Sequence, residues 1–173
     1  MNRRELMGGV MGLAASATTA ADAPDASPLI TRRIPSTGEA IPVIGLGTSG
    51  PFEVGAEPGA RAPLKAVVDA FFAGGGRLVD TSPMYSTAER VLGELLSPAQ
   101  QEACFMATKV WADGAGAGAA QVADSARLLK HAPLDLVQVH NLRDLDAHLK
   151  TLRALKAQGR LRYIGITHYT VSA

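Results

Sequence analysis

The sequence has only one cysteine, Cys104, so no disulfide can form within the chain. Cys104 lies in an apolar run, which favours a buried and unreactive thiol. An excess of charge is also missing, because 17 Lys and Arg balance 16 Asp and Glu and are scattered along the chain. A chain without a basic patch has no electrostatic means of holding a phosphate backbone, so nucleic acid is not expected as a partner.

Long hydrophobic runs are absent too, and no stretch reaches the ~20 apolar residues that a stable membrane span needs. Near the start, Arg3 and Arg4 precede a small-residue stretch, Met7 to Ala21, that has no acidic residue. This pattern is typical of a twin-arginine export signal. We therefore predict a signal and linker over residues 1–28, recognised by the export machinery, and a periplasmic or exported mature protein. The alternative is a frayed start with two incidental arginines in a cytoplasmic protein.

After residue 28 the chain repeats a unit of apolar strand, amphipathic helix and Gly or Pro break. A hairpin with its turn at Thr37-Gly38 comes first. The predicted strands then occupy residues 43–47, 77–80, 104–109, 134–140 and 162–167. Their ends are about 30 residues apart, as in parallel β/α units. We predict an α/β fold, a TIM (β/α)8 barrel of which residues 29–173 form about the first five units as one domain.

Four segments have apolar residues at helical spacing. The first buries one face made of Leu64, Val67, Val68, Phe71 and Phe72. The second begins at Ser86, which is predicted to form a capping box with Glu89. A third spans residues 119–130. The fourth is capped by Asp144 and ends at Gly159, where a helix favours a residue with positive φ.

Polar side chains end three successive predicted strands: Asp80, Lys109 and His140. Taken singly, each has a simple structural explanation, as a turn cap, a solvated charge and a half-buried imidazole. Together they share one register, and the carboxyl ends of barrel strands are where barrel enzymes place their catalytic groups. We therefore expect these three side chains to converge at the mouth of the barrel.

Tyr85 follows Asp80 in the next loop, and its neighbours indicate an acid. An ammonium from Lys109 beside the phenol would stabilise the phenolate that remains after proton transfer, and Asp80 would hold that ammonium in place. His140 would give a second hydrogen bond to the same substrate oxygen. The sequence thus predicts a catalytic group of Asp80, Tyr85, Lys109 and His140.

The motifs around these residues resemble the successive signatures of aldo/keto reductases: Gly45-Leu46-Gly47-Thr48, Val79 to Tyr85, Ala107 to Trp111, Asp135 to Asn141 and Gly159 to Ile166. The resemblance implies an oxidoreductase that uses NADPH, or NADH, to reduce a small-molecule aldehyde or ketone, with Tyr85 as the proton donor. It also implies a cofactor site at Gly47, Thr48, Asp80, Asn141, Thr167 and His168, and a substrate pocket with Trp111 and Asn141.

Two positions depart from that family pattern. Thr167-His168 replaces the usual Ser-Asn after the fifth strand, and an imidazole lacks the full donor and acceptor pattern of an amide. Ser49 stands where the family often has a Trp after Thr48, so one aromatic wall of the pocket is missing. Trp111 is expected to supply another. The stretch Gly45 to Gly50 also satisfies G-x-G-x-x-G, but Pro and Gly residues follow it and no acid appears about 20 residues on, so a Rossmann site is not expected.

Three other functions fit part of the pattern. Asp80, His140 and His168 are competent zinc ligands, although no metal site is expected, and they suggest a metal-dependent barrel hydrolase. Lys109 alone suggests Schiff-base chemistry. The third alternative is a truncated copy that is catalytically incomplete. It is kept because five units leave an exposed sheet edge and omit the segments with which the family binds the adenosine 2′-phosphate. We therefore expect a longer natural product or an incomplete reading frame.

Overall fold

Strands and helices alternate along the chain. The computed structural model describes residues 29–170, and the predicted export signal lies outside the described residues. The strands are β1 (Thr31–Arg33), β2 (Ala40–Pro42), β3 (Gly45–Gly47), β4 (Leu78–Asp80), β5 (Phe105–Val110), β6 (Leu134–His140) and β7 (Leu161–Thr167). The helices are α1 (Pro58–Ala73), α2 (Ala88–Leu95), α3 (Pro98–Ala103), α4 (Ala115–Leu129) and α5 (Leu145–Ala157).

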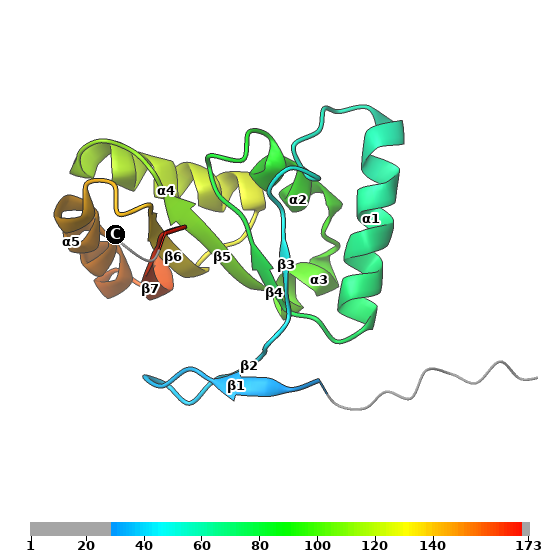
Figure 1. The fold of residues 1–173 in the computed structure, drawn as a ribbon, viewed down its shortest axis with the longest axis horizontal. Helices are drawn as coiled ribbons and strands as arrows, with labels where there is room; N and C mark the ends of the chain where they lie inside the picture. Colours follow the sequence, from blue (N-terminus) through cyan, green and yellow to red (C-terminus); the bar gives the residue numbers. More distant parts are fainter. Residues whose placement is uncertain (1–28, 171–173) are drawn as a thin grey trace, which may run out of the picture.

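Strands β3 to β7 form one parallel sheet in which each strand pairs with the next along the chain, while β1 and β2 form a separate antiparallel hairpin (Figure 1). A dinucleotide-binding sheet would reverse its strand order at a switch point, whereas an unbroken sequential order is that of a barrel wall. The five predicted β/α units and the hairpin are confirmed. Turns rather than a helix follow Gly47, which agrees with the rejection of a Rossmann site.

Helix α1 begins within the Pro- and Gly-containing stretch after Gly50, where no helix was expected. Pro58 occupies its first turn. A proline there gives up only a backbone N–H that has no helical partner, so it starts a helix instead of interrupting it. Leu64 and Val68 are buried as predicted, but Val67 is 47% exposed. Because α1 lies at one side of the sheet and packs along a single stripe, its buried face is narrower than predicted (Figure 1).

The core lies between the sheet and the helices. Every residue of β5 is buried, which is typical of a parallel strand covered on both faces. Cys104, just before β5, is 5% exposed. Burial, with the Asp135 carboxylate nearby, raises the pKa of this thiol to about 12, so the predicted unreactive cysteine is confirmed.

The predicted start of the second helix is wrong. Helix α2 begins at Ala88, Ser86 has a φ of 46°, and no side chain caps the helix. The reason is tertiary: Glu89 does not turn back to Ser86, because its carboxylate accepts a hydrogen bond from Thr108 Oγ1 at 2.6 Å. The capping box of this region belongs instead to α3, where Ser97 and Gln100 exchange hydrogen bonds.

Helix α4 starts earlier than predicted, whereas α5 starts directly after Asp144 as predicted but without the expected side-chain cap. Helix α4 begins at Ala115, before the expected residue 119, and Gly118 within it lies against His148 of α5, where a Cβ atom would be 2.5 Å from the imidazole Nδ1. Asp144 precedes α5 but does not cap it, because its carboxylate accepts a hydrogen bond from the Gly114 amide. Gly159 has the positive φ that was predicted, 72°.

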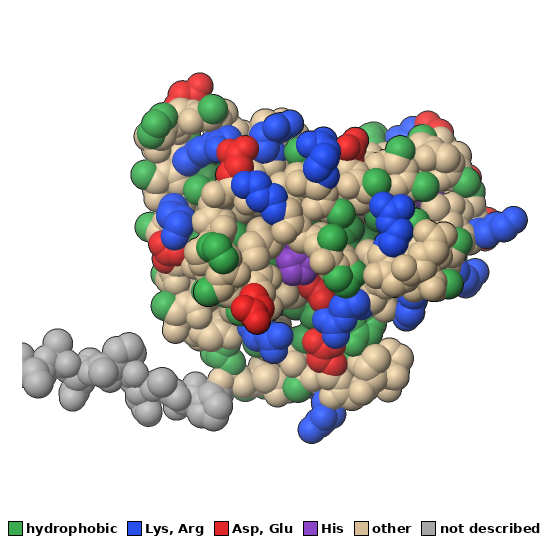
Figure 2. Space-filling view, turned by 180° about the vertical axis from the view of Figure 1, so that it is seen from behind, with side chains coloured by type: hydrophobic (Ala, Val, Ile, Leu, Met, Phe, Trp, Pro, Cys, Tyr) green, Lys and Arg blue, Asp and Glu red, His purple; other side chains and the backbone are tan. Residues whose placement is uncertain are grey.

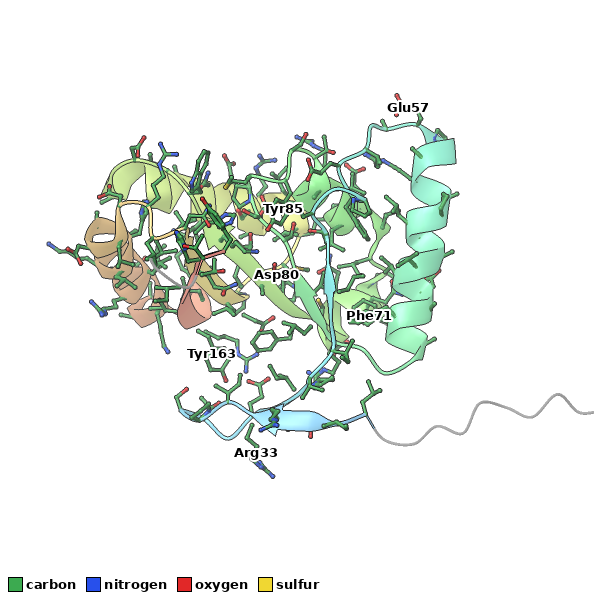
Figure 3. The ribbon with its side chains drawn as sticks, in the orientation of Figure 1. Arg33, Glu57, Phe71, Asp80, Tyr85 and Tyr163 are labelled. Atoms are coloured by element: carbon green, nitrogen blue, oxygen red, sulfur yellow. The ribbon has the colours of Figure 1, made fainter. Side chains whose placement is uncertain are left out.

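The hairpin closes the end of the sheet opposite the strand ends that carry Asp80 and Lys109. Glu39 of the hairpin pairs with Arg162 and accepts a hydrogen bond from the Tyr163 hydroxyl at 2.7 Å. Thr37 at the hairpin turn also contacts this hydroxyl, at 2.8 Å. Figure 3 shows Tyr163 beside the hairpin and Tyr85 at the far end of the sheet.

Asp135 of β6 lies at the hairpin end of the sheet and bonds to residues of the neighbouring strands β5 and β7. Its carboxylate accepts hydrogen bonds from the Met106 amide at 2.7 Å, from His131 at 3.0 Å and from Arg162 at 2.5 Å. Burial alone would raise the pKa of Asp135, but the hydrogen bonds from His131, Met106 and Arg162 outweigh it and hold the pKa below its ordinary value.

We predict that Asp135→Asn lowers the free energy of unfolding by about 2 kcal/mol at pH 7, because three donors lose a carboxylate. A lowered folded pKa contributes stability above the unfolded value of about 3.9, and that contribution disappears as pH falls through the folded pKa. The difference between variant and wild type should therefore shrink below about pH 4 in urea titrations. Asp124→Asn, which removes an exposed pair with Arg127, is the matched control and should change nothing measurable. An Asp135→Asn deficit that is equal at pH 7 and pH 3 would contradict the assignment.

The face of the molecule seen in Figure 2 carries charges of both signs. Figure 2 shows Lys, Arg, Asp and Glu side chains intermixed over one face of the molecule. Among residues 29–170, no helix has the length and apolar character required to cross a membrane.

Candidate active site

The predicted catalytic residues meet at the carboxyl ends of the strands. The Lys109 ammonium is 5% exposed and donates to Asp80 Oδ2 at 2.5 Å and to the Thr81 carbonyl at 2.9 Å. It lies 5.1 Å from the centre of the Tyr85 ring. Figure 3 shows Asp80 and Tyr85 both at a distance from the hairpin, with Tyr85 further from it than Asp80. The structure therefore brings the cation, its carboxylate and the phenol together, as expected.

His140 completes this group. It is 9% exposed, and its ring is edge-on to the Tyr85 ring, with 6.2 Å between the ring centres. Burial first, and the Lys109 ammonium second, lower the pKa of His140, whereas the Asp80 carboxylate acts in the opposite direction. His140 is therefore a neutral imidazole at pH 7, able to donate one hydrogen bond.

This electrostatic assignment makes a prediction with opposite signs for two variants. In an NMR titration, the His140 imidazole of the wild type should titrate below the ordinary value of 6.5. Lys109→Met removes a repelling cation, so the pKa of His140 should rise; Asp80→Asn removes the attracting carboxylate, so it should fall. Shifts in the same direction for both variants would show that their charges do not act on His140. Circular dichroism checks that each variant is folded.

Gln138 belongs to the site and was missed from the sequence. Its side-chain amide donates to Asp80 Oδ1 at 3.3 Å, so Asp80 is held from β6 as well as by Lys109. Gly165, its partner across β7, leaves the necessary room, because a Cβ there would be 3.1 Å from Gln138 Cγ. The signal was present: Gln138 precedes His140 by two positions, and residues two apart on a strand face the same side.

Trp111 follows β5 and is 37% exposed, as a pocket wall would be. Its backbone N–H donates to the Gln121 side chain at 2.6 Å, and its carbonyl accepts from the same amide group. The Arg143 guanidinium lies 4.2 Å from the Trp111 ring centre and also pairs with Asp113. The His148 imidazole Nε2 contacts the Ala112 carbonyl at 2.8 Å. This loop is thus held by α4, α5 and the loop before α5, which fixes the position of the indole.

The predicted cofactor residues divide into two kinds. Gly47 ends β3, and a Cβ there would have no atom within 4 Å, so its surroundings are open. Asn141 directly follows β6, and its side-chain amide makes no hydrogen bond to another residue of the 29–170 segment. Thr48 differs, because its side chain is fully buried and its hydroxyl donates to the Asp80 carbonyl at 3.1 Å. Because the whole residue is buried, Thr48 exposes no atom to a cofactor in this structure, and its place in the cofactor site stays a prediction.

Thr167 and His168 lie at the end of β7. His140 and Thr167 are partners across the β6–β7 pair, which places Thr167 beside the site. His168 is half-buried, its Nδ1 accepts from the Thr170 amide at 3.1 Å, and its ring stacks on Tyr169. The side chain expected to replace the family amide is therefore partly engaged by its own turn.

The rival chemistries find no support in the geometry. Within the 29–170 segment, no three His, Cys, Asp or Glu side chains lie close enough together to hold a metal ion. Asp80, His140 and His168 therefore do not form the zinc cluster that the alternative hydrolase function would need. Schiff-base chemistry needs a free amine, whereas Lys109 is an ammonium paired with Asp80 and hydrogen-bonded to Thr81.

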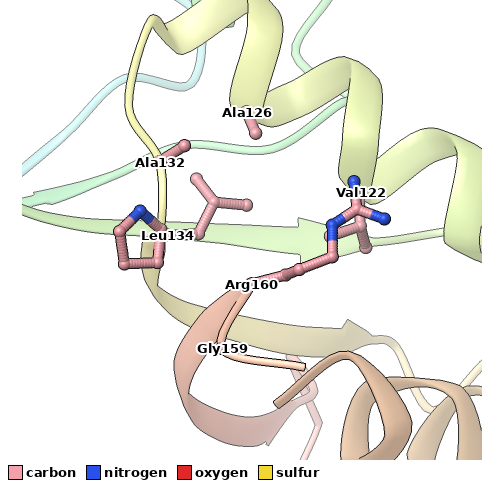
Figure 4. A pocket seen from close by; sticks show the side chains of 7 residues that line it. Val122, Ala126, Ala132, Leu134, Gly159 and Arg160 are labelled. Atoms are coloured by element: carbon pink, nitrogen blue, oxygen red, sulfur yellow. The ribbon is translucent and has the colours of Figure 1, made fainter. Parts of the chain in front are cut away.

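A pocket of about 280 Å³ lies elsewhere, between α4 and the segments that lead into β6 and β7 (Figure 4). It is lined by Val122, Ala126, Ala132, Pro133, Leu134, Gly159 and Arg160. Leu134 starts β6 and Arg160 precedes β7, so the pocket is at the amino-terminal ends of the strands. That end of a barrel serves stability rather than catalysis. The chemistry is thus not in this pocket but at the opposite end.

Comparisons with known proteins bear on the family and the fold of the chain. The family model described as the aldo/keto reductase family matches residues 43–173. Comparison with curated protein sequences finds no match. A putative aldo-keto reductase from Pseudomonas aeruginosa is 27% identical, with a TM-score of 0.70 over 83% of this chain and 61% of that one. An aldo-keto reductase from Klebsiella pneumoniae, solved with NADPH, is 25% identical, with a TM-score of 0.70 over 83% and 52%.

A further solved structure, the aldo-keto reductase of Bacillus halodurans, shares the fold at 22% identity, with a TM-score of 0.69. It is covered over 50% of its length, so the chain spans about half to three fifths of these solved reductases. The family match covers most of the chain and includes every strand of the parallel sheet. The chain belongs to the aldo/keto reductase family.

Proposed function

We propose that this chain carries the catalytic end of an NADPH-dependent carbonyl reductase that converts small aldehydes or ketones to alcohols. The observation that carries the proposal is the Lys109 ammonium, buried between the Asp80 carboxylate and the Tyr85 ring. A buried cation beside a phenol favours release of the phenolic proton. The Klebsiella relative was solved with NADPH, which supports the same cofactor here, with NADH as the alternative.

Each residue then has a separate task in the reduction. NADPH, when bound, supplies the hydride that adds to the carbonyl carbon. Tyr85 gives its phenolic proton to the carbonyl oxygen, and Lys109 stabilises the phenolate that remains. Asp80, which accepts a hydrogen bond from Gln138, holds Lys109 in position, and neutral His140 donates a hydrogen bond to the same substrate oxygen.

The residues present fit the nicotinamide end of this cofactor. Gly47 leaves open space at the end of β3, and the Asn141 amide can both donate and accept a hydrogen bond. Thr167 and His168 would contribute from the end of β7. We assign the substrate pocket to Trp111 and Asn141, and residues 29–173 to the reductase domain.

The test is a fluorescence titration of the full chain with NADPH, followed by NADPH oxidation with a panel of aldehydes and ketones. We expect saturable binding and turnover. The chain spans only about half of its solved relatives, which favours a second candidate, a catalytically incomplete domain. Saturable binding without turnover by any carbonyl would support that candidate and contradict the reductase. Turnover unaffected by EDTA separates the reductase from metal-dependent chemistry.

We also propose that residues 1–28 form a twin-arginine signal and linker, and that the mature domain is periplasmic or exported. Arg3-Arg4 and the following small residues support this proposal. The twin-arginine route suits a domain that folds around its nicotinamide before transport, because free NADPH is a cytoplasmic compound. Fractionation with amino-terminal sequencing tests the idea, and a protein found only in the cytoplasm with Met1 intact contradicts it.

A further inference from the structure

Ser82, which the catalytic group does not include, lies directly behind His140. The serine is fully buried, and its Oγ is 3.2 Å from His140 Nδ1. The same oxygen accepts a hydrogen bond from the Met84 amide, also at 3.2 Å. Within residues 29–170 the Ser82 hydroxyl makes hydrogen-bond contacts with these two nitrogens and with no other group.

These two contacts decide the direction of the hydrogen bond. The Met84 N–H can only donate, so it uses a lone pair of the Ser82 oxygen. The Ser82 hydroxyl hydrogen then needs an acceptor, and His140 Nδ1 is the one within reach. If Nδ1 carried the proton instead, the hydroxyl hydrogen would be buried without a partner, which costs about 1–3 kcal/mol. The Ser82 O–H therefore donates, and Nδ1 accepts.

A neutral imidazole carries one proton, so an accepting Nδ1 leaves that proton on Nε2. Nε2 has no hydrogen-bond partner in the part of the chain that the structure describes, and it is therefore available to a ligand. Resting on the proposed function, we propose that Ser82 is a positioning residue that fixes His140 as the Nε2–H tautomer, so that this N–H and the Tyr85 hydroxyl both face the substrate carbonyl oxygen. With the opposite tautomer, a lone pair would meet that oxygen and repel it.

Imidazole 15N chemical shifts test the tautomer without any need for activity, because protonated and unprotonated ring nitrogens resonate far apart. The experiment uses the full chain labelled with 15N-histidine at neutral pH, and His140→Gln identifies the His140 signals among the four histidines. We expect a protonated Nε2 and an unprotonated Nδ1 in the wild type. In Ser82→Ala both shifts should move toward each other as the Nδ1–H form becomes populated, and Ser82→Thr, which keeps a hydroxyl, should restore them.

Kinetics supply the second readout. Ser82→Ala should lower kcat for carbonyl reduction about tenfold, the effect of losing one oriented hydrogen bond, and leave the Kd for NADPH unchanged. Ser125→Ala, another buried serine to alanine change, is the matched control and should alter neither readout. A protonated Nδ1 in the wild type would overturn the role of Ser82. So would His140 15N shifts in Ser82→Ala that are the same as those of the wild type. A wild type without turnover would contradict the proposed function, while the shifts still decide the tautomer.

Discussion

Tyr85→Phe should reduce the rate of NADPH-dependent carbonyl reduction by about 10²–10⁴-fold, because it removes the proton donor and leaves the rest of the site in place. The ring itself remains, so the edge-on contact with His140 and the approach of Lys109 are kept. The affinity for NADPH, measured by fluorescence titration, should not change. Steady-state kinetics should show the loss in kcat rather than in KM for the carbonyl.

The control for this experiment is Tyr163→Phe, another tyrosine that loses its hydroxyl. Tyr163 lies at the opposite end of the sheet and bonds to Thr37 and Glu39 of the hairpin. This variant should lose some stability in urea titrations and keep its turnover. Equal turnover in Tyr85→Phe and wild type would remove Tyr85 as the acid. A loss of NADPH binding in Tyr85→Phe would show that the phenol acts in cofactor binding instead.

Gly93→Ala should destabilise the fold more than alanine at any other glycine among residues 29–170, because the close contacts of its Cβ would be with backbone atoms. Gly93 is buried in α2 against α4, and a Cβ there would lie 2.1 Å from the Leu128 carbonyl oxygen and 2.9 Å from the Leu129 backbone. Backbone atoms cannot move aside as a flexible side chain would, so the two helices must separate. We expect a loss of about 3 kcal/mol in the free energy of unfolding. The melting temperature should fall by roughly 6–12 °C.

Gly116→Ala is the matched control, because Gly116 also lies within a helix but has open space where its Cβ would be. This variant should be as stable as the wild type or slightly more so, since alanine favours helix over glycine. Urea denaturation of both variants gives the comparison. Equal midpoints for Gly93→Ala and Gly116→Ala would show that α2 and α4 do not pack as closely as described.

Most of the strand ends, and the convergence of Asp80, Lys109 and His140, could be predicted because they depend on local alternation of residue types. A polar side chain after an apolar run marks the ends of β4 at Asp80 and of β6 at His140, while β5 continues one residue beyond Lys109 to Val110. Helix starts were predicted less well. Ser86 and Glu89 have the spacing of a capping box, yet Glu89 bonds to Thr108, which is distant in sequence. Which partner a polar side chain selects is a tertiary property, and local spacing cannot reveal it.

The supporting residues of the site were missed for the same reason. Gln138 and Ser82 have ordinary positions in the sequence, and their roles depend on Asp80 and His140, each 58 residues away. Val67 was predicted to be buried and is exposed. Helical periodicity predicts which side of α1 is apolar, but it does not predict how wide the contact of that side with the sheet is. Sequence patterns thus located the residues of the proposed catalytic group better than the residues that hydrogen-bond to them.

The long-range contacts of the β1–β2 hairpin have a consequence for the order of folding. Each strand of the sheet can pair as soon as the next β/α unit has been synthesised, since neighbours in space are neighbours in sequence. The hairpin is made first, but its bonds run to Tyr163 and Arg162, between 123 and 126 residues later. During synthesis the hairpin therefore cannot pack against the sheet until β7 has emerged from the ribosome. Its packing is a late folding step that depends on long-range contacts.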